Sequence, residues 1–159
     1  MPKPVQVTTP SDREISVVRV FDAPCELIWD CHTKPELMKR WLFGPAGWSM
    51  PECEVDLRVG GRYRYLWRHT DGRLFGSSGE HREIVPHERI VTTERMDGFD
   101  GEAVNTLELA ESGGRTTLTV TMCFPSKEHR DGALKSGMAD GMAQGYDRID
   151  EIAAEHAAA

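Results

Sequence analysis

The chain has 159 residues, enough for one domain with its own core, and 39% hydrophobic with 28% charged residues is typical of a globular protein. A net charge of −7 argues against nucleic acid and anionic membrane surfaces as partners. No apolar run approaches the roughly 18 residues of a membrane helix, and the N-terminus lacks the apolar segment of a signal peptide. We therefore expect a cytoplasmic protein with no membrane span and no nucleic-acid partner.

Residues 1–12 contain three prolines and are expected to form a flexible N-terminal arm. A single domain follows over residues 13–156. Within residues 13–21 apolar and polar side chains alternate, which predicts a first strand. Its apolar members are Ile15, Val17 or Val18, and Val20.

Two short helices are predicted after this strand. Pro24 suits the first turn of a helix whose apolar part runs to Trp29. Thr33 and Glu36 have the spacing of a capping box and predict the start of a second helix, which ends near Arg40.

A loop rich in glycine, proline and aromatic residues, 41–50, separates these helices from a series of strands. Gly60-Gly61 and Asp71-Gly72 are typical of two-residue hairpin turns. Three further turns are expected at 86–88, 97–101 and 112–114. The strands between these turns are predicted at about 51–58, 62–69, 73–85, 89–96, 102–110 and 115–123.

The chain ends in a long predicted helix that begins after Ser126, its expected N-cap, and meets no further proline. Its apolar face recurs at steps of three and four residues. That face contains Leu134, Met138, Gly141, Met142, Gly145, Ile149 and Ile152. Gly137, Gly141 and Gly145 lie on one side, where they allow either close packing against a strand or room for a ligand.

The elements together predict an α+β fold in which a curved seven-stranded antiparallel sheet surrounds the long C-terminal helix. The two short helices follow the first strand. The concave face of the sheet then packs against the C-terminal helix, either as a solid core or around a cavity.

Aromatic side chains suggest where such a cavity has its wall. Tyr63, Tyr65 and Trp67 share one face of a predicted strand, and Trp41 and Trp48 flank the loop at the expected cavity mouth. Aromatic walls of this kind suit an apolar or aromatic ligand. Core packing is favoured for each residue taken alone, and a pocket wall is favoured for the stripe as a set.

The alternation of side chains along a strand places several other residues on the same inner face. Asn105 shares its face of the strand with Leu107 and Leu109, and Met122 shares its face of the next strand with Val120. A carboxylate turned inward, for example from Glu83, Glu94 or Glu108, would need a partner such as Arg82 or Arg95.

The cysteines and histidines point to no metal or cofactor. Cys25, Cys31, Cys53 and Cys123 contain no C-x-x-C pair, and no zinc spacing is found among the histidines, so reduced thiols are expected. His69 and His81 lie on predicted strands, and His81 is the better candidate for a cavity acid or base. No nucleophile motif is present, so no catalytic residue is assigned.

Several motifs are similar, in their order and spacing, to a known family. They begin with Arg-Val-Phe-Asp-Ala-Pro at 19–24, Trp29, and Pro-Glu-Leu at 35–37. The others are Asp56–Tyr63, Gly79-Glu80, Val85–Val91, Gly137-Met138, Gly141 and Asp147–Ile149. Over residues 13–156 the chain thus resembles the family named for the C-terminal domain of the Hsp90-ATPase activator, within the START/Bet v 1-like, or polyketide cyclase-like, superfamily.

This resemblance implies a helix-grip fold with a cavity that relatives use for lipids, hormones or polyketides. The leading hypothesis is a small hydrophobic or aromatic ligand, with cyclase-like chemistry left open, and the alternative is a chaperone-interacting module with a role in stress responses. A homodimer also stays open. The predicted ligand-binding residues are Trp41, Trp48, Tyr63, Tyr65, Trp67, His81, Asn105, Met122, Met138, Gly141 and Met142.

Overall fold

The structure, a computed structural model, describes residues 4–158. Its strands are β1 (Gln6–Thr8), β2 (Glu14–Phe21), β3 (Trp48–Val55), β4 (Arg62–His69), β5 (Leu74–Val85), β6 (Arg89–Met96), β7 (Ala103–Ser112) and β8 (Arg115–Cys123). Its helices are α1 (Cys25–Thr33), α2 (Pro35–Met38), α3 (Lys127–Lys135) and α4 (Met138–Ala158).

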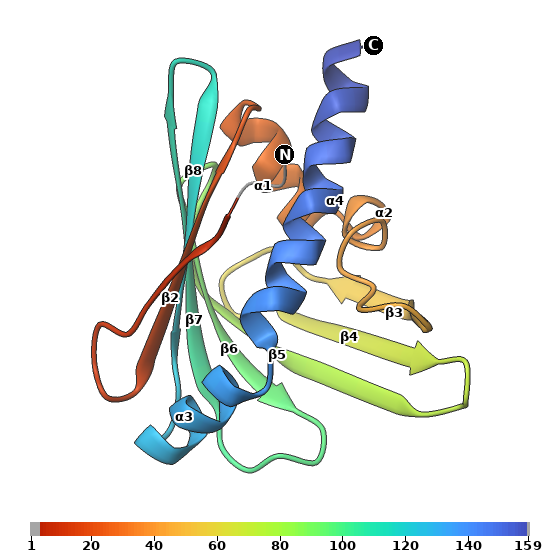
Figure 1. Cartoon of the computed structure of the whole chain (residues 1–159), viewed down its shortest axis with the longest axis vertical. Coiled ribbons are helices and arrows are strands. Elements are labelled where there is room, and N and C mark those ends of the chain that lie inside the picture. Colours follow the sequence, from red (N-terminus) through yellow and green to blue (C-terminus); the bar gives the residue numbers. More distant parts are fainter. Residues whose placement is uncertain (1–3, 159) are drawn as a thin grey trace.

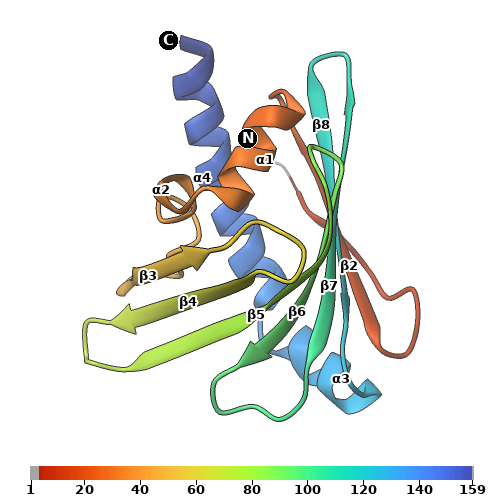
Figure 2. The same cartoon turned by 180° about the vertical axis from the view of Figure 1, so that it is seen from behind.

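All strands belong to one antiparallel sheet with the order β1-β2-β8-β7-β6-β5-β4-β3. The sheet bends strongly, and α4 lies in its hollow with α1 and α2 beside it (Figures 1 and 2). The predicted α+β helix-grip architecture is confirmed, but the sheet has eight strands instead of seven. The additional strand is β1, which pairs with β2 from within the segment expected to be an arm; residues 1–3 of that arm lie outside the described residues.

The turn residues predict some strand boundaries correctly and others incorrectly. Gly113 and Gly114 both have positive φ values, 59° and 76°, which suits the two-residue turn between β7 and β8. The predicted two-residue turns at Gly60-Gly61 and Asp71-Gly72 are wrong, because residues 56–61 and 70–73 form longer connections. The strand expected at about 51–58 also begins earlier, at Trp48.

The inner face of β2 differs from its predicted apolar pattern. Ile15, Val17, Arg19 and Phe21 are buried, whereas Val20 is 38% exposed on the outer face. The alternation of strand side chains therefore places a charged arginine, not Val20, among the core residues. The prediction that Val20 lies on the inner face was wrong, because Val18 and Val20 share the opposite face of the strand.

The second short helix starts without the predicted capping box. Lys34 is the N-cap of α2 and makes no side-chain cap hydrogen bond, and Pro35 occupies the first turn. The hydroxyl of Thr33 instead donates to the carbonyl oxygen of Trp29, 2.9 Å away, at the end of α1. The helix ends at Met38, about two residues before the predicted boundary.

The C-terminal helical region is broken, not continuous as predicted. Ser126 caps α3 by accepting a hydrogen bond from the backbone N–H of His129 at 3.1 Å, as expected. Gly137 then adopts a left-handed conformation with φ 81°, which ends α3 and turns the chain into α4. Because Leu134 precedes the break, it is 40% exposed and does not extend the apolar face of α4.

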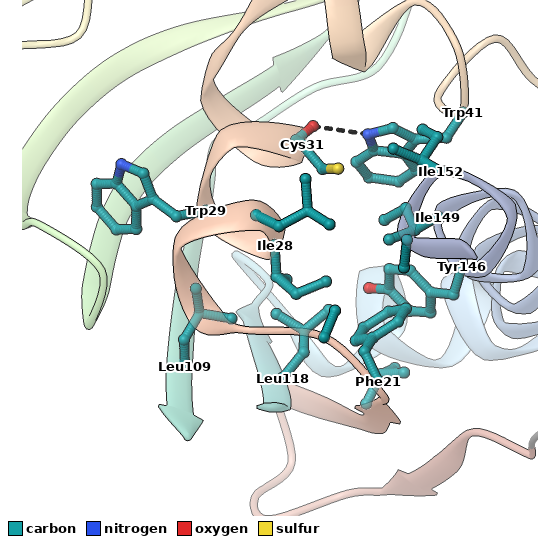
Figure 3. Close-up of a cluster of buried hydrophobic side chains, with 14 of the residues drawn as sticks. Phe21, Ile28, Trp29, Cys31, Trp41, Leu109, Leu118, Tyr146, Ile149 and Ile152 are labelled. Atoms are coloured by element: carbon teal, nitrogen blue, oxygen red, sulfur yellow. Dashed lines mark hydrogen bonds between the residues drawn. The ribbon is translucent and has the colours of Figure 1, made fainter. Parts of the chain in front are cut away.

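The main core lies between α1, the later turns of α4 and the β2–β8–β7 part of the sheet. Phe21, Leu118, Tyr146 and Ile149 meet there, and the Phe21 and Tyr146 rings pack edge to face at 5.7 Å (Figure 3). The indole N–H of Trp41 donates to the carbonyl oxygen of Cys31 at 2.6 Å. None of the helices within residues 4–158 combines the length and apolar composition that crossing a membrane requires.

Candidate functional site

The concave face of the sheet is sealed on one side and accessible on the other. Under the later turns of α4, core residues such as Ile15, Leu118 and Ile149 have no exposed surface. On β4 to β7, several side chains of the same face remain partly exposed, among them Tyr65, Trp67, Phe75, Thr92, Glu94 and Asn105. The accessible side is therefore the part of this face that a ligand could reach.

A continuous series of aromatic rings follows this accessible face. Phe99 contacts Phe75 at 6.3 Å between ring centroids, and Phe75 contacts Trp67 at 6.0 Å. Trp67 contacts Tyr65 at 6.0 Å, and Tyr65 contacts Tyr63 at 4.8 Å. These distances lie within the range of favourable aromatic pairs, so the rings form one wall that runs from the rim to the interior.

At the rim the wall opens into a cleft with a volume of about 630 Å³. Its lining consists of Gly44, Pro45, Trp48, Trp67, Arg73, Leu74, Phe75 and Phe99. The Arg73 guanidinium lies 5.4 Å from the centre of the Trp48 ring, a cation–π distance. Phe99 is 66% exposed, so the cleft offers an apolar aromatic surface to solvent.

At the inner end of the wall lies a polar cluster around the Glu94 carboxyl. The Ser77 hydroxyl donates to Glu94 Oε2 at 3.2 Å, and the Asn105 side chain also hydrogen-bonds this carboxyl. Burial raises the pKa of Glu94 above its ordinary value, while both hydrogen bonds act in the opposite direction. Ser77 is fully buried, and it lies opposite Tyr65 in the β4–β5 register.

Among residues 4–158, Glu94 has no arginine partner, contrary to the sequence-based expectation. Arg95 pairs with Glu102 at 3.3 Å, and Arg82 pairs with Glu80 at 3.4 Å, both on exposed side chains. Neutral hydroxyl and amide donors therefore stabilise the buried carboxyl instead of a positive charge.

The two tyrosines of the wall stay protonated at physiological pH. Burial raises the pKa of Tyr63 and Tyr65, and the nearby Glu94 carboxyl adds to the effect at both residues. The Tyr63 hydroxyl donates to the carbonyl oxygen of Thr93 at 2.7 Å. This hydrogen bond fixes the inner end of the wall.

Some predicted site residues lie away from this surface. Trp41 is 6% exposed and packs in the main core against His32 and Tyr146. His81 is on the concave side of β5 but only 4% exposed, with Nδ1 donating to the Gly61 carbonyl oxygen at 3.1 Å. Tyr63 lies against the His81 ring, at 5.8 Å between centroids.

The three predicted methionines belong to the main core or pack against it, and Gly141 is exposed. Met122 pairs with Asn105 between β8 and β7, and Met138 and Met142 pack against the main core while staying partly exposed. A side chain added at Gly141 would meet no atom within 4 Å, in contrast to Gly145, where it would contact the Trp41 ring at 3.2 Å. Gly141 is an exposed position of α4 and opens to solvent.

Sequence reasoning missed Phe75 and Ser77, because β5 was too polar to assign to a face, and it left open whether Glu94 on β6 turns inward. The β4–β5 register pairs Trp67 with Phe75 and Tyr65 with Ser77. A two-residue turn at 71–72 would have shifted this pairing by one residue and turned Phe75 to the outer face. The apolar Phe75 opposite the aromatic stripe was the signal that could have corrected the register.

The structure gives less support to a metal site, a reactive cysteine or a site in the second hollow. Within residues 4–158, no three His, Cys, Asp or Glu side chains gather as metal ligands. Burial raises the pKa of the Cys31 and Cys53 thiols to about 11, so neither is a ready nucleophile. A second hollow of about 490 Å³ has a mixed polar and apolar lining that includes Arg89, Glu108 and Thr119 on the outer face of the sheet.

The curved antiparallel sheet, the helix in its hollow and the aromatic wall together define a helix-grip protein of the START-like class, a ligand-binding fold. Residues 22–154 match the family described as Activator of Hsp90 ATPase homolog 1-like protein, and the chain belongs to this family. No curated protein matches the sequence.

Solved structures agree with this assignment. A protein from Rhodobacter sphaeroides is 32% identical with a TM-score of 0.91, and the alignment covers 96% of this chain and 99% of that one. A protein from Nitrosomonas europaea is 24% identical with a TM-score of 0.83, over 95% and 100% of the two chains. CalU16 from Micromonospora echinospora is 21% identical with a TM-score of 0.64, over 95% and 72%. The last two likenesses concern the fold alone.

Proposed function

We propose that this protein binds a small, flat hydrophobic or aromatic molecule between the accessible concave face of the sheet and α4. The observation that carries the proposal is the unbroken series of ring contacts from Phe99 to Tyr63. Such a wall offers a large apolar surface with little conformational entropy to lose on binding.

Two features support a ligand instead of a solid core. The aromatic wall leads into a cleft of about 630 Å³, a volume in the usual range of small-molecule sites. In the first turns of α4, Gly141 is exposed, and an added side chain there would meet no atom within 4 Å. Glycine in a helix is unfavourable relative to alanine by about 1 kcal/mol, so a glycine beside open space suggests a need for that space.

Isothermal titration with 2-methoxynaphthalene tests the proposal. We expect saturable binding to the wild-type protein and at least tenfold weaker binding to Trp67→Ala, because a central ring of the wall is lost. Leu66→Ala is the matched control, since Leu66 precedes Trp67 on β4 and points to the opposite face. Unchanged affinity in Trp67→Ala, or weakening in both variants alike, would contradict binding at this wall.

The family description supplies a second candidate, an interaction with an Hsp90-type ATPase. That function would use the charged outer surface, so binding should weaken as salt rises and should be insensitive to Trp67→Ala. A pull-down with purified Hsp90 at low and high salt distinguishes the two candidates.

A further inference from the structure

The polar cluster at the inner end of the aromatic wall contains too few hydrogen-bond donors for its acceptors. Glu94, Ser77 and Asn105 lie on three neighbouring strands, β6, β5 and β7, and Glu94 shares the inner face of β6 with Thr92, the register partner of Asn105. The Tyr63 hydroxyl and the Thr92 side chain are other polar groups nearby. A carboxyl that is costly to bury is thus placed where the wall ends.

The cluster has more hydrogen-bond acceptors than hydrogen-bond donors. A carboxyl has about four lone-pair directions, and the described residues supply two donors, the Ser77 hydroxyl and the Asn105 amide. The Asn105 Oδ1 atom is itself buried and accepts no hydrogen bond from any residue in 4–158. The nearby Tyr63 hydroxyl is occupied, because it donates to the Thr93 carbonyl oxygen. The cluster therefore lacks a hydrogen-bond donor.

The cleft and the cluster are close enough for one small molecule to contact both. Phe75 lines the cleft and Ser77 lies two residues further along the same face of β5, a rise of roughly 7 Å. Tyr65 and Trp67 flank this path on β4. A bicyclic aromatic molecule lying against these rings would present its inner edge to Glu94.

We propose that Glu94 and Asn105 recognise a hydrogen-bond donor, a hydroxyl or N–H group, on the inner edge of a flat aromatic ligand. This inference rests on the proposed function and adds the chemistry of the ligand. Such a group donates one hydrogen bond, either to a free lone pair of Glu94 or to Asn105 Oδ1, which is otherwise buried without a partner among residues 4–158. A ligand carrying a carboxylate at that edge is excluded, because it places a second negative charge beside Glu94 without a cation in the cluster.

Three naphthalenes that differ in one substituent test this inference by isothermal titration with the wild-type protein. We expect 2-naphthol to bind about tenfold more tightly than 2-methoxynaphthalene, because only the hydroxyl donates to the carboxyl. The carboxylate 2-naphthoate should bind more weakly than both. In Glu94→Leu the preference for 2-naphthol should fall below twofold, whereas Glu108→Leu, on the outer face of β7, should retain it.

The outcomes separate this inference from the proposed function. Equal affinities for 2-naphthol and 2-methoxynaphthalene in the wild type, or a preference that survives in Glu94→Leu, would overturn donor recognition while leaving aromatic binding intact. Absence of binding for all three naphthalenes would overturn both. The wild-type comparison needs no variant, so a folding defect in Glu94→Leu does not affect it, and Asn105→Ala provides a second variant with the same expected loss of preference.

Discussion

Arg19 on β2 donates a hydrogen bond of 2.6 Å to Asp150 on α4, and its side chain is completely buried. The same guanidinium nitrogen donates to Asp147 at 3.1 Å. These ion pairs join the first long strand to the helix in the hollow of the sheet. Arg19 also has two nitrogens, Nε and Nη1, that are buried without a hydrogen-bond partner within residues 4–158, so the two carboxylates are essential for its charge.

Removing both carboxylates should therefore destabilise the fold strongly. Asp147→Ala/Asp150→Ala should lower the free energy of unfolding by about 3–5 kcal/mol, because it leaves a buried charge without compensation. Arg19→Met should cost less, since Asp147 and Asp150 are 46% and 31% exposed and can be solvated. Urea unfolding measures both, with Glu151→Ala on the exposed face of α4 as the control. A double variant as stable as that control would show that the ion pairs contribute nothing.

Two glycines of α4 should respond oppositely to the same substitution. Gly141→Leu should leave stability unchanged or raise it by up to about 1 kcal/mol, because it meets open space and removes a helical glycine. Gly145→Leu should cost about 1–3 kcal/mol by overlap with Trp41. Denaturant unfolding checks the signs. If α4 borders the ligand site, Gly141→Leu also weakens 2-methoxynaphthalene binding, and a neutral effect on both quantities would place Gly141 outside it.

His32 should make the protein less stable in mild acid. Burial lowers its pKa to about 4, and its Nε2 atom accepts no hydrogen bond from the described residues. Since an unfolded histidine titrates near pH 6.5, the unfolded chain takes up the proton first. Stability present above pH 6.5 is therefore lost as the pH falls toward about 4, by about 2–4 kcal/mol in total.

Urea unfolding of His32→Leu across this pH range checks the prediction. The variant should lose less stability between pH 6.5 and 4 than the wild type does. His156→Gln, at an exposed position of α4, should retain the wild-type dependence. Parallel pH profiles for all three proteins would rule out a role for His32.

Glu94 should have the opposite pH dependence. Its pKa is raised by burial, so the unfolded chain, in which glutamate titrates near pH 4.3, loses the proton first as the pH rises. The stability present below about pH 4.3 is then lost as the pH rises through the folded pKa. Glu94→Gln should thus be more stable, relative to the wild type, at pH 7 than at pH 4, as measured by urea unfolding. The exposed Glu54→Gln serves as control, and a Glu94→Gln difference independent of pH would refute the expectation.

The periodicity of the sequence by itself determined the antiparallel sheet, most strand boundaries and the presence of a helix after Ser126. These properties depend on local side-chain patterns and turn residues, which is why the stripe of Tyr63, Tyr65 and Trp67 was recognisable. The break at Gly137 was missed because a glycine in a helical pattern can either continue the helix or adopt a positive φ.

Only the tertiary structure decided what the stripe faces. The β4–β5 register, set by a connection longer than two residues, brought Phe75 and Ser77 beside it, and a one-residue shift would have turned both away. The inward direction of Glu94 and the burial of Trp41 likewise depend on packing between elements far apart in the chain. Local patterns predict which face of a strand a side chain occupies, but contacts between strands and helices determine its neighbours.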